Sequence, residues 1–315
     1  MTKLKPTTPR KLLIAIFVGV FAIYFIYVHA AYFSIQYKVA NSTLPYLSPR
    51  IFAENQNDIL INFISLRDQL RQFVASKNNT LGVYFEYLPS GTSIGVNDRE
   101  EHRFASLLKV PVVMAYYLQA EKEGLSINQT FEIKDDELDK GYGDLWRKGY
   151  GTKITANELI KEILINSDNT ALKVLADHTK RGYVEFIFNN LDVTLDRDEN
   201  NIQTISPKKY SSIFRSLYLS SLLPKEQSNK ILEVMTQSSA HDTLTEGVPP
   251  QIKVANKIGE LSDELYWDCG IIYEPKRPYL VCAFSTQTTS EAKNDISTIS
   301  KIIYDYIHNV NTAEK

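Results

Sequence analysis

Histidine, cysteine and excess positive charge are all scarce in this 315-residue chain. Its five histidines are scattered, so the sequence contains no metal-ligand cluster, and we expect neither a metal nor another cofactor: His29, His102, His178, His241 and His308. The first eleven residues hold four of the 35 basic residues and none of the 37 acidic ones, which leaves 31 basic against 37 acidic residues in the remainder. This balance argues against a nucleic-acid partner, which needs a concentrated basic face. Internal repeats and low-complexity tracts are also missing, and 43% hydrophobic residues are enough for a large core.

One long run with no charge after its first residue departs from this ordinary composition. The segment "KLLIAIFVGVFAIYFIYV", from Lys11 to Val28, is long enough to cross a bilayer as a helix. Basic residues precede it, so we expect a cytoplasmic tail at 1–11, a single-pass membrane anchor at 12–32 and an extracytoplasmic remainder at a bacterial cell membrane. "VHA" at 28–30 also fits a cleaved signal peptide, which would release the protein.

The only two cysteines lie on either side of "EPKRP", a turn signal between two strand-like runs. A tight turn centred on Pro275 and Lys276 would place Cys269 opposite Cys282 in the resulting hairpin. An oxidising environment would permit a disulfide there. Two buried free thiols in adjacent strands are an equally good interpretation.

Strand patterns occur early and late in the chain, with helical patterns between them. Residues 33–55 are typical of a linker, 58–74 have helical spacing, and "PSG" within 80–97 indicates a hairpin. Thr155 and Glu158 form a capping-box pattern, Ser206 and Pro207 begin another helix, and further helical runs cover 223–235 and 294–310. We therefore predict an α+β (α/β) fold in which both chain ends build an antiparallel sheet with flanking helices and an inserted helical lobe.

Ser106 and Lys109 are the first candidates for chemistry. In "FASLLKVPVV" they stand three positions apart, so a helix would place them on one face. The apolar neighbours favour partial burial of Lys109, which makes a neutral, proton-accepting amine easier to reach. A hydroxyl needs such a base to attack a carbonyl. A serine that merely begins a helix is the competing interpretation.

Two further motifs follow in order. "INSDNTAL" places Ser167, Asp168 and Asn169 at a break between helical runs, where a helix N-cap is the simpler interpretation. "VANKIGE" places Lys257 and Gly259 on a strand, where glycine permits close approach of another backbone or a ligand.

The order Ser-x-x-Lys, Ser-Asp-Asn, Lys-x-Gly resembles the class A β-lactamase and penicillin-binding protein group. Segments such as "VYFEYLPSGTSIGVND", "ELIKEILINSDNTALKVL" and "CGIIYEPKRPYLVCAFS" extend the resemblance over roughly residues 56–310. We take 56–315 as the catalytic domain and expect a monomer.

The resemblance implies a role for each matched residue. Ser106 would be the acylated nucleophile, Lys109 its proton acceptor, and Ser167 the proton relay to the leaving nitrogen. Lys257 would keep the site electropositive, while Asn169 would bind the substrate's amide carbonyl. In addition, the backbone N–H groups of Ser106 and Glu260 would bind the oxyanion, with Gly259 between Lys257 and Glu260.

The sequence departs from the family pattern at three places. Ile258 replaces the usual Thr or Ser, and Cys269 stands where an arginine would otherwise help to hold a substrate carboxylate. Glu199 follows Leu195 in "TLDRDENNIQTISP", as the deacylating glutamate of class A enzymes does. However, that loop is short, and Gln203 replaces the expected asparagine.

Three functions remain open at this point. The first is a serine hydrolase that is acylated by β-lactams at Ser106, hydrolyses their amide with Glu199 as the base, and thereby confers antibiotic resistance. The second is a penicillin-binding D-Ala-D-Ala peptidase or transpeptidase acting on peptidoglycan stem peptides. The third is a catalytically silent wall-binding module.

Overall fold

A computed structural model describes residues 9–40, 45–48 and 61–310 of the chain. The chain forms two compact units, residues 1–45 and residues 46–315. In the first unit, helix α1 spans Pro9–Ala40 and therefore includes residues 33–40 of the predicted linker. The remaining linker positions 41–44 and 49–55, and positions 58–60 of the predicted helix, lie outside the described residues.

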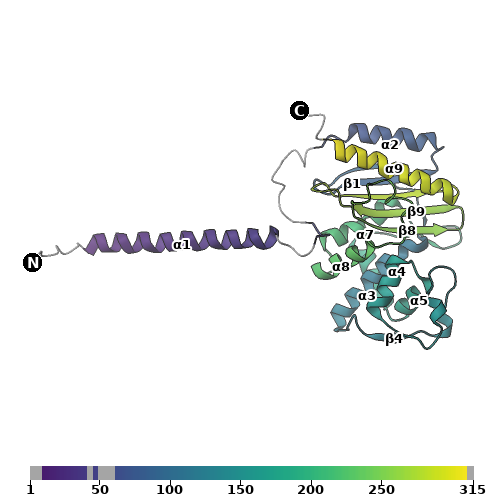
Figure 1. Ribbon diagram of the computed structural model, residues 1–315, viewed down its shortest axis with the longest axis horizontal. Coiled ribbons are helices and arrows are strands. Elements are labelled where there is room, and N and C mark those ends of the chain that lie inside the picture. Colours follow the sequence, from purple (N-terminus) through teal and green to yellow (C-terminus); the bar gives the residue numbers. More distant parts are fainter. Residues whose placement is uncertain (1–8, 41–44, 49–60, 311–315) are drawn as a thin grey trace, which may run out of the picture. The chain divides into compact units, whose positions relative to one another are not determined.

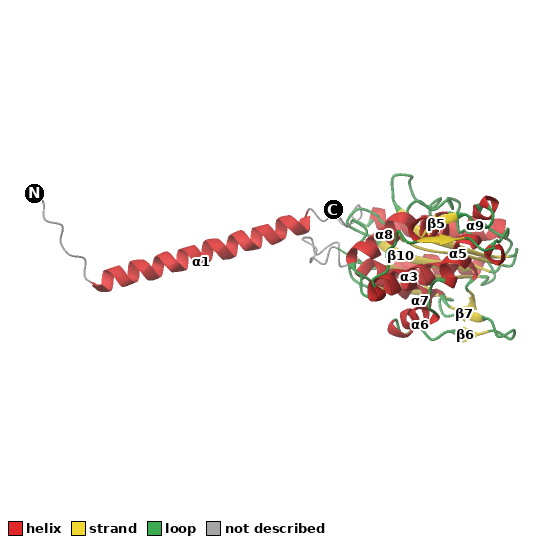
Figure 2. Ribbon diagram, turned by 90° about the horizontal axis from the view of Figure 1, so that it is seen from below, coloured by secondary structure: helices red, strands yellow, loops and turns green. Residues whose placement is uncertain are grey.

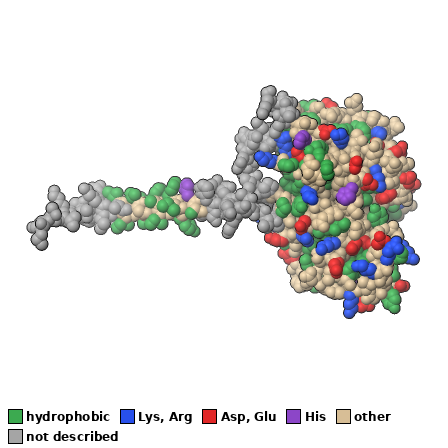
Figure 3. Space-filling model, viewed as in Figure 1, with side chains coloured by type: hydrophobic (Ala, Val, Ile, Leu, Met, Phe, Trp, Pro, Cys, Tyr) green, Lys and Arg blue, Asp and Glu red, His purple; other side chains and the backbone are tan. Residues whose placement is uncertain are grey.

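The prediction of a membrane anchor needs correction. A bilayer crossing needs about 20 consecutive, predominantly apolar residues in one helix. Among the helices that the structure describes, none combines sufficient length with sufficient apolarity to cross a membrane. The predicted anchor at 12–32, the membrane contact through this segment and the single-pass location at a bacterial membrane were therefore wrong. Large apolar side chains of α1 between Ile14 and Val28 are nevertheless exposed within the unit (Figure 3).

The second unit is built on a five-stranded antiparallel sheet in the order β2-β1-β10-β9-β8. Both chain ends contribute to it, as predicted: β1 Leu81–Tyr87, β2 Thr92–Val96, β8 Val254–Leu261, β9 Leu265–Ile272 and β10 Tyr279–Ser285. Helices α2 (Ile64–Ser76) and α9 (Thr289–Asn309) cover one face, and α7 (Pro207–Leu219) and α8 (Lys225–Met235) lie on the other (Figure 1).

The helical lobe extends from that second face (Figures 1 and 2). Its helices are α3 Lys109–Glu123, α4 Ala156–Ile165, α5 Asn169–Asp177 and α6 Arg181–Asn190, with the 3-10 turns η2 Ala105–Leu108, η3 Asp135–Glu137 and η4 Leu145–Lys148. Two small sheets complete it, formed by β4 Thr130–Glu132 with β5 Lys153–Thr155, and by β3 His102–Arg103, β7 Gln203–Ile205 and β6 Asp196–Arg197.

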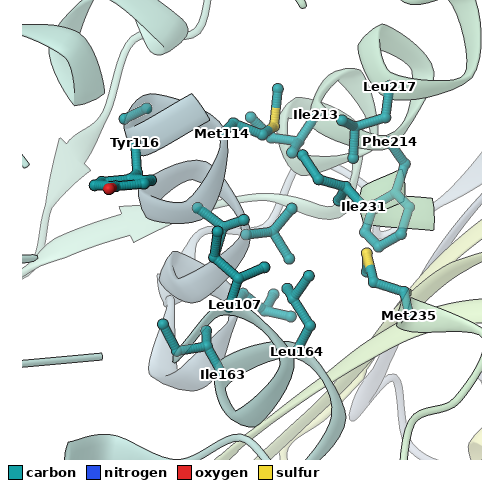
Figure 4. Packing of buried hydrophobic residues seen from close by; sticks show 14 of the residues in the cluster. Leu107, Met114, Tyr116, Ile163, Leu164, Ile213, Phe214, Leu217, Ile231 and Met235 are labelled. Carbon is teal, nitrogen blue, oxygen red and sulfur yellow. The ribbon is translucent and has the colours of Figure 1, made fainter. Parts of the chain in front are cut away.

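Both faces of the sheet are buried, which explains why its central strands are almost continuously apolar. In β10, Val281 and Ala283 pack with α2 and α9, whereas Leu280, Cys282 and Phe284 pack toward the helical lobe. Figure 4 shows the lobe side, where Leu107 of η2 lies among side chains of α3, α4, α7 and α8. Burial of Leu107 fixes η2 and hence the position of Ser106.

Local sequence signals place several elements correctly. Thr155 and Glu158 form the predicted capping box at α4, and the Ser206 hydroxyl accepts the N–H of Lys209 at α7. Cys269 lies directly opposite Cys282, and the two form a disulfide. The turn centred on Pro275 and Lys276 is thus confirmed, and the disulfide decides between the two interpretations of the cysteines.

Candidate active site

Ser106 and Lys109 meet where η2 joins α3. The Lys109 ammonium nitrogen Nζ lies 3.1 Å from Ser106 Oγ, and Lys109 is only 2% exposed. Ala105, just before the serine, has a left-handed φ of 48°. Non-glycine residues adopt this conformation at an energetic cost, and such residues cluster at functional sites.

The loop between α4 and α5 adds Ser167 and Asn169 to the same cluster. Lys109 Nζ donates to Ser167 Oγ at 3.0 Å and to Asn169 Oδ1 at 2.8 Å, and it also contacts the Ser167 carbonyl oxygen. Asp168 is the N-cap of α5, because its side chain accepts the N–H of Ala171 at 2.8 Å; it also accepts the N–H of Leu145 in η4, at 2.8 Å. Both interpretations of this motif therefore hold: Asp168 caps α5 while its two neighbours face Lys109.

Strand β8 supplies Lys257 from a third part of the chain. Its Nζ donates to Ser167 Oγ at 2.9 Å and to the Ile258 carbonyl oxygen at 3.0 Å. A Cβ atom on Gly259 would lie 3.1 Å from the Phe104 carbonyl oxygen and 3.2 Å from Leu107 Cγ. Glycine thus allows β8 to lie against η2, as the sequence predicted.

Burial disfavours the charged form of both Lys109 and Lys257. It lowers the pKa of Lys109 to about 8, against the opposing effect of Asp168 and Asp139. It also lowers the pKa of Lys257 to about 7, an effect that the nearby Lys109 strengthens and Asp268 opposes. Since both amines contact Ser167 Oγ, one of them is easily neutral near physiological pH, and a neutral amine can accept a proton from a hydroxyl.

Tyr142 and Asp139 also belong to the site, although the sequence did not identify them as site residues. The Tyr142 carbonyl oxygen accepts the Asn169 N–H at 2.9 Å, and Lys109 Nζ lies 5.9 Å from the centroid of its ring. Asp139 Oδ1 accepts from Asn169 Nδ2 at 3.2 Å. The sequence signal for this loop was the pair of glycines in "KGYGD". Gly143 has a φ of 82°, and a Cβ atom there would lie 2.1 Å from Asp168 Oδ2, so the loop can lie against Asp168 only with glycine at this position.

Glu199 is not brought into this cluster. It is exposed at the turn between β6 and β7, and among the described residues it has no hydrogen bond or ion pair. Its neighbour Asp198 holds the turn by accepting from Arg103 Nε at 2.6 Å and from the N–H groups of Asn200 and Ile202, each at 2.9 Å.

A cavity of about 670 Å³ lies on an adjoining face of α3. Leu108 and Val112 line it, together with Phe188 of α6 and with Leu195 and Gln203 on either side of the Glu199 turn. None of Ser106, Lys109, Ser167 and Lys257 lines it, so this space is separate from the lysine and serine cluster.

The remaining sequence candidates lie on β8 and β9. Glu260 is exposed near the end of β8, where it pairs with Tyr266. Ile258 is buried opposite Asp268 and packs with the α2 and α9 side of the sheet. Cys269 pairs with Lys257 across the strands, so its disulfide occupies the position where the family pattern has an arginine.

Comparisons with known proteins agree with this architecture. The model of a family described as "Beta-lactamase enzyme family" matches residues 65–307. A beta-lactamase from Bacillus licheniformis is 25% identical over 253 residues, which are 75% of this chain and 81% of that protein. Beta-lactamase 3 from Bacillus cereus is 26% identical over 249 residues, 72% and 77% of the two chains.

Solved structures show the same fold. A PBP-A mutant, solved as an acyl-enzyme complex with penicillin G, has a TM-score of 0.71 at 20% identity over 78% of this chain and 97% of its own. A class A beta-lactamase from Bacteroides cellulosilyticus has a TM-score of 0.70 at 18% identity, over 79% and 100%. The predicted resemblance and fold are thereby confirmed, and the chain belongs to the beta-lactamase enzyme family of serine hydrolases.

Proposed function

We propose that Ser106 is acylated by β-lactams and that the protein hydrolyses the β-lactam amide. One observation carries this proposal: a single amine, Lys109 Nζ, lies within hydrogen-bond distance of Ser106 Oγ, Ser167 Oγ and Asn169 Oδ1. This is the arrangement of nucleophile, base and proton relay that acyl transfer needs.

Acylation follows from this geometry. Neutral Lys109 takes the proton of Ser106 Oγ, which attacks the ring carbonyl carbon, and the backbone N–H groups of Ser106 and Glu260 bind the oxyanion. The carbon–nitrogen bond breaks as Ser167 Oγ gives its proton to the leaving nitrogen and takes one from Lys109 Nζ, 3.0 Å away, so that Lys109 is neutral again. Lys257, 2.9 Å from Ser167 Oγ, stabilises that hydroxyl as its charge changes. These steps use side chains and backbone of one chain, in keeping with a catalytic domain at 56–315 that acts as a monomer without a cofactor.

Asn169 orients the substrate in this scheme. Its Oδ1 is held by Lys109 and its Nδ2 points toward Asp139. Substrate binding replaces the 3.2 Å contact to Asp139 by a hydrogen bond from Nδ2 to the amide carbonyl of the substrate. Gly259 lets β8 lie against η2, which keeps this strand next to Ser106.

The fate of the acyl-enzyme separates two functions. Hydrolysis requires a base for water, and Glu199 takes this role only when its turn moves toward Ser106. Its exposed position favours a second candidate, a penicillin-binding D-Ala-D-Ala peptidase or transpeptidase that β-lactams acylate durably. PBP-A, whose mutant was solved as a penicillin acyl-enzyme, is similar in fold.

Mass spectrometry after mixing with penicillin G, followed over time, tests both. We expect a covalent adduct on the wild type and none on Ser106→Ala; an unmodified wild type would refute acylation. Decay of the adduct that Glu199→Gln slows supports hydrolysis through Glu199. A stable adduct, or a slow decay that the substitution leaves unchanged, supports the peptidase. Asp192→Asn, another exposed acid near this segment, is the matched control.

A further inference from the structure

The end of β8 beside the proposed site carries a group of charged residues that the acylation chemistry does not use. We call Tyr142, Asp242, Glu260, Tyr266 and Lys293 the acidic rim. Resting on the proposed function of Ser106, we propose that the acidic rim disfavours substrates with a carboxylate next to the reacting amide and favours those that are neutral or cationic there.

The members of the rim come from five segments of the chain. Glu260 on β8 lies directly opposite Tyr266 on β9. Lys293 of α9 places its Nζ 2.7 Å from Asp242 Oδ2 and 5.6 Å from the centroid of the Tyr266 ring. Tyr142 joins the rim to the catalytic cluster, because its ring lies 5.9 Å from Lys109 Nζ.

The acidic residues raise the pKa of two nearby tyrosines, Tyr142 and Tyr266. Burial raises the pKa of Tyr142, and Glu260 and Asp242 raise it further, whereas Lys293 lowers it. Tyr266 has a buried hydroxyl with no hydrogen-bond partner in the described part of the chain. Burial raises its pKa, and Asp268, Asp242 and Glu260 act in the same direction. The negative charges of Asp242 and Glu260 thus act both on Tyr266 and on Tyr142, whose ring lies next to Lys109.

The charges of the rim do not cancel. Lys293 is paired with Asp242, while Glu260 Oε1 accepts only from the neutral Thr289 hydroxyl, at 3.0 Å, among the described residues. The positive end of α9 does not compensate, because Asp263 Oδ1 already accepts the Thr289 N–H at 2.5 Å. One negative charge is therefore left over beside the strand along which the substrate would lie.

Neighbouring positions offer a carboxylate little help. Ile258 is apolar, Cys269 is in the disulfide, and Lys257 already donates to Ser167 Oγ and to the Ile258 carbonyl oxygen. A penicillin carries its carboxylate on the carbon next to the ring nitrogen, so its binding brings that group toward the rim. Like charges a few ångströms apart near a protein surface repel measurably. The same repulsion would be absent for an esterified carboxylate and become attraction for an ammonium group.

The test compares penicillin G with its methyl ester, which differ in charge at this position alone. The quantity measured is the ratio of their second-order rates of acylation at Ser106, anion over ester, by mass spectrometry of quenched samples. Glu260→Gln keeps the shape and the acceptor for Thr289 but removes the charge, and we expect it to raise the ratio about three- to tenfold. Lys293→Gln leaves Asp242 unpaired, so we expect it to lower the ratio.

Glu226→Gln is the control, since Glu226 is an exposed acid on α8 and its loss causes the same change in net charge. It is expected to leave the ratio within about twofold. Ratios for Glu260→Gln and Lys293→Gln that match this control would overturn the inference while leaving Ser106 acylation intact. If neither compound acylated the wild type, the proposed function and this inference would both be refuted.

Discussion

We expect acylation of Ser106 to follow a bell-shaped pH profile with its maximum between about pH 7 and pH 8. The reason is that two buried amines share Ser167 Oγ, with pKa values of about 8 for Lys109 and about 7 for Lys257. The proposed chemistry needs a neutral Lys109 and a charged Lys257. The two amines together must therefore carry one proton, and this singly protonated state is most populated at a pH between their two pKa values.

The magnitude follows from these values. Below about pH 7 the rate is expected to fall roughly tenfold per pH unit as Lys109 retains its proton, and above about pH 8 it falls as Lys257 loses its own. Because the base has the higher pKa, only a small fraction of the molecules, on the order of a tenth, carries the single proton on Lys257 at the maximum.

Single-turnover acylation by penicillin G methyl ester, measured from pH 5.5 to pH 10, is the suitable assay because this uncharged substrate is not attracted by the changing charge of the two lysines. Lys257→Met is expected to lower the rate and to abolish the alkaline limb, leaving the acid limb that Lys109 produces. Lys253→Met, an exposed lysine just before β8, is the control and is expected to keep the bell. A wild-type rate that rises through a single midpoint near pH 10 would refute the reasoning, since ordinary exposed lysines titrate there.

Three further predictions concern stability and packing. Burial lowers the pKa of Lys257, so between about pH 7 and pH 10.5 the unfolded chain binds more protons than the folded chain, and this lysine destabilises the fold most at low pH. Lys257→Met is therefore expected to raise the free energy of unfolding, measured in urea titrations, by about 1–4 kcal/mol at pH 7. This gain is expected to shrink toward pH 10. A gain that instead grows with pH would contradict this sign. Gly259→Ala pushes a Cβ against the Phe104 carbonyl oxygen at 3.1 Å, so we expect acylation to slow roughly tenfold or more and the melting temperature to fall, and unchanged kinetics would show that β8 and η2 separate freely. Thr155→Ala removes the cap of α4 and is expected to cost about 1 kcal/mol, read from denaturant midpoints, with Thr152→Ala as the control.

Much of the fold could be predicted from the sequence because its signals are local. The turn between β9 and β10 fixes the pairing of Cys269 with Cys282, and Ser206 and Thr155 mark helix starts by side-chain hydrogen bonds within one turn. The prediction of a membrane anchor, made from the apolar run at 12–28 and the basic residues before it, was wrong, because no helix in the described part of the chain is long and apolar enough to cross a membrane.

Site residues could be predicted only where reactive side chains stand at a characteristic spacing in the sequence. Ser106 and Lys109 are three residues apart, so a helical turn alone brings them together. Tyr142 reaches the site by a loop whose course depends on Gly143 lying against Asp168, a contact between distant segments. The position of Glu199 depends likewise on the Asp198 contacts to Arg103 and to its own turn, which hold the hairpin in a form that spacing could not reveal.

Precise placement of the cluster has a structural cost that the burial of neighbouring residues offsets. Ala105 and Ser167 both adopt left-handed backbone conformations, each of which costs on the order of 1–3 kcal/mol outside glycine. Leu107 is fully buried two residues after the first, and Asp168 is fully buried directly after the second. These anchored neighbours leave Ser106 and Ser167 no relaxed alternative, so the two hydroxyls are held at Lys109 before any substrate arrives. Preorganisation of this kind lowers the barrier to attack because the groups need not reorient during the reaction.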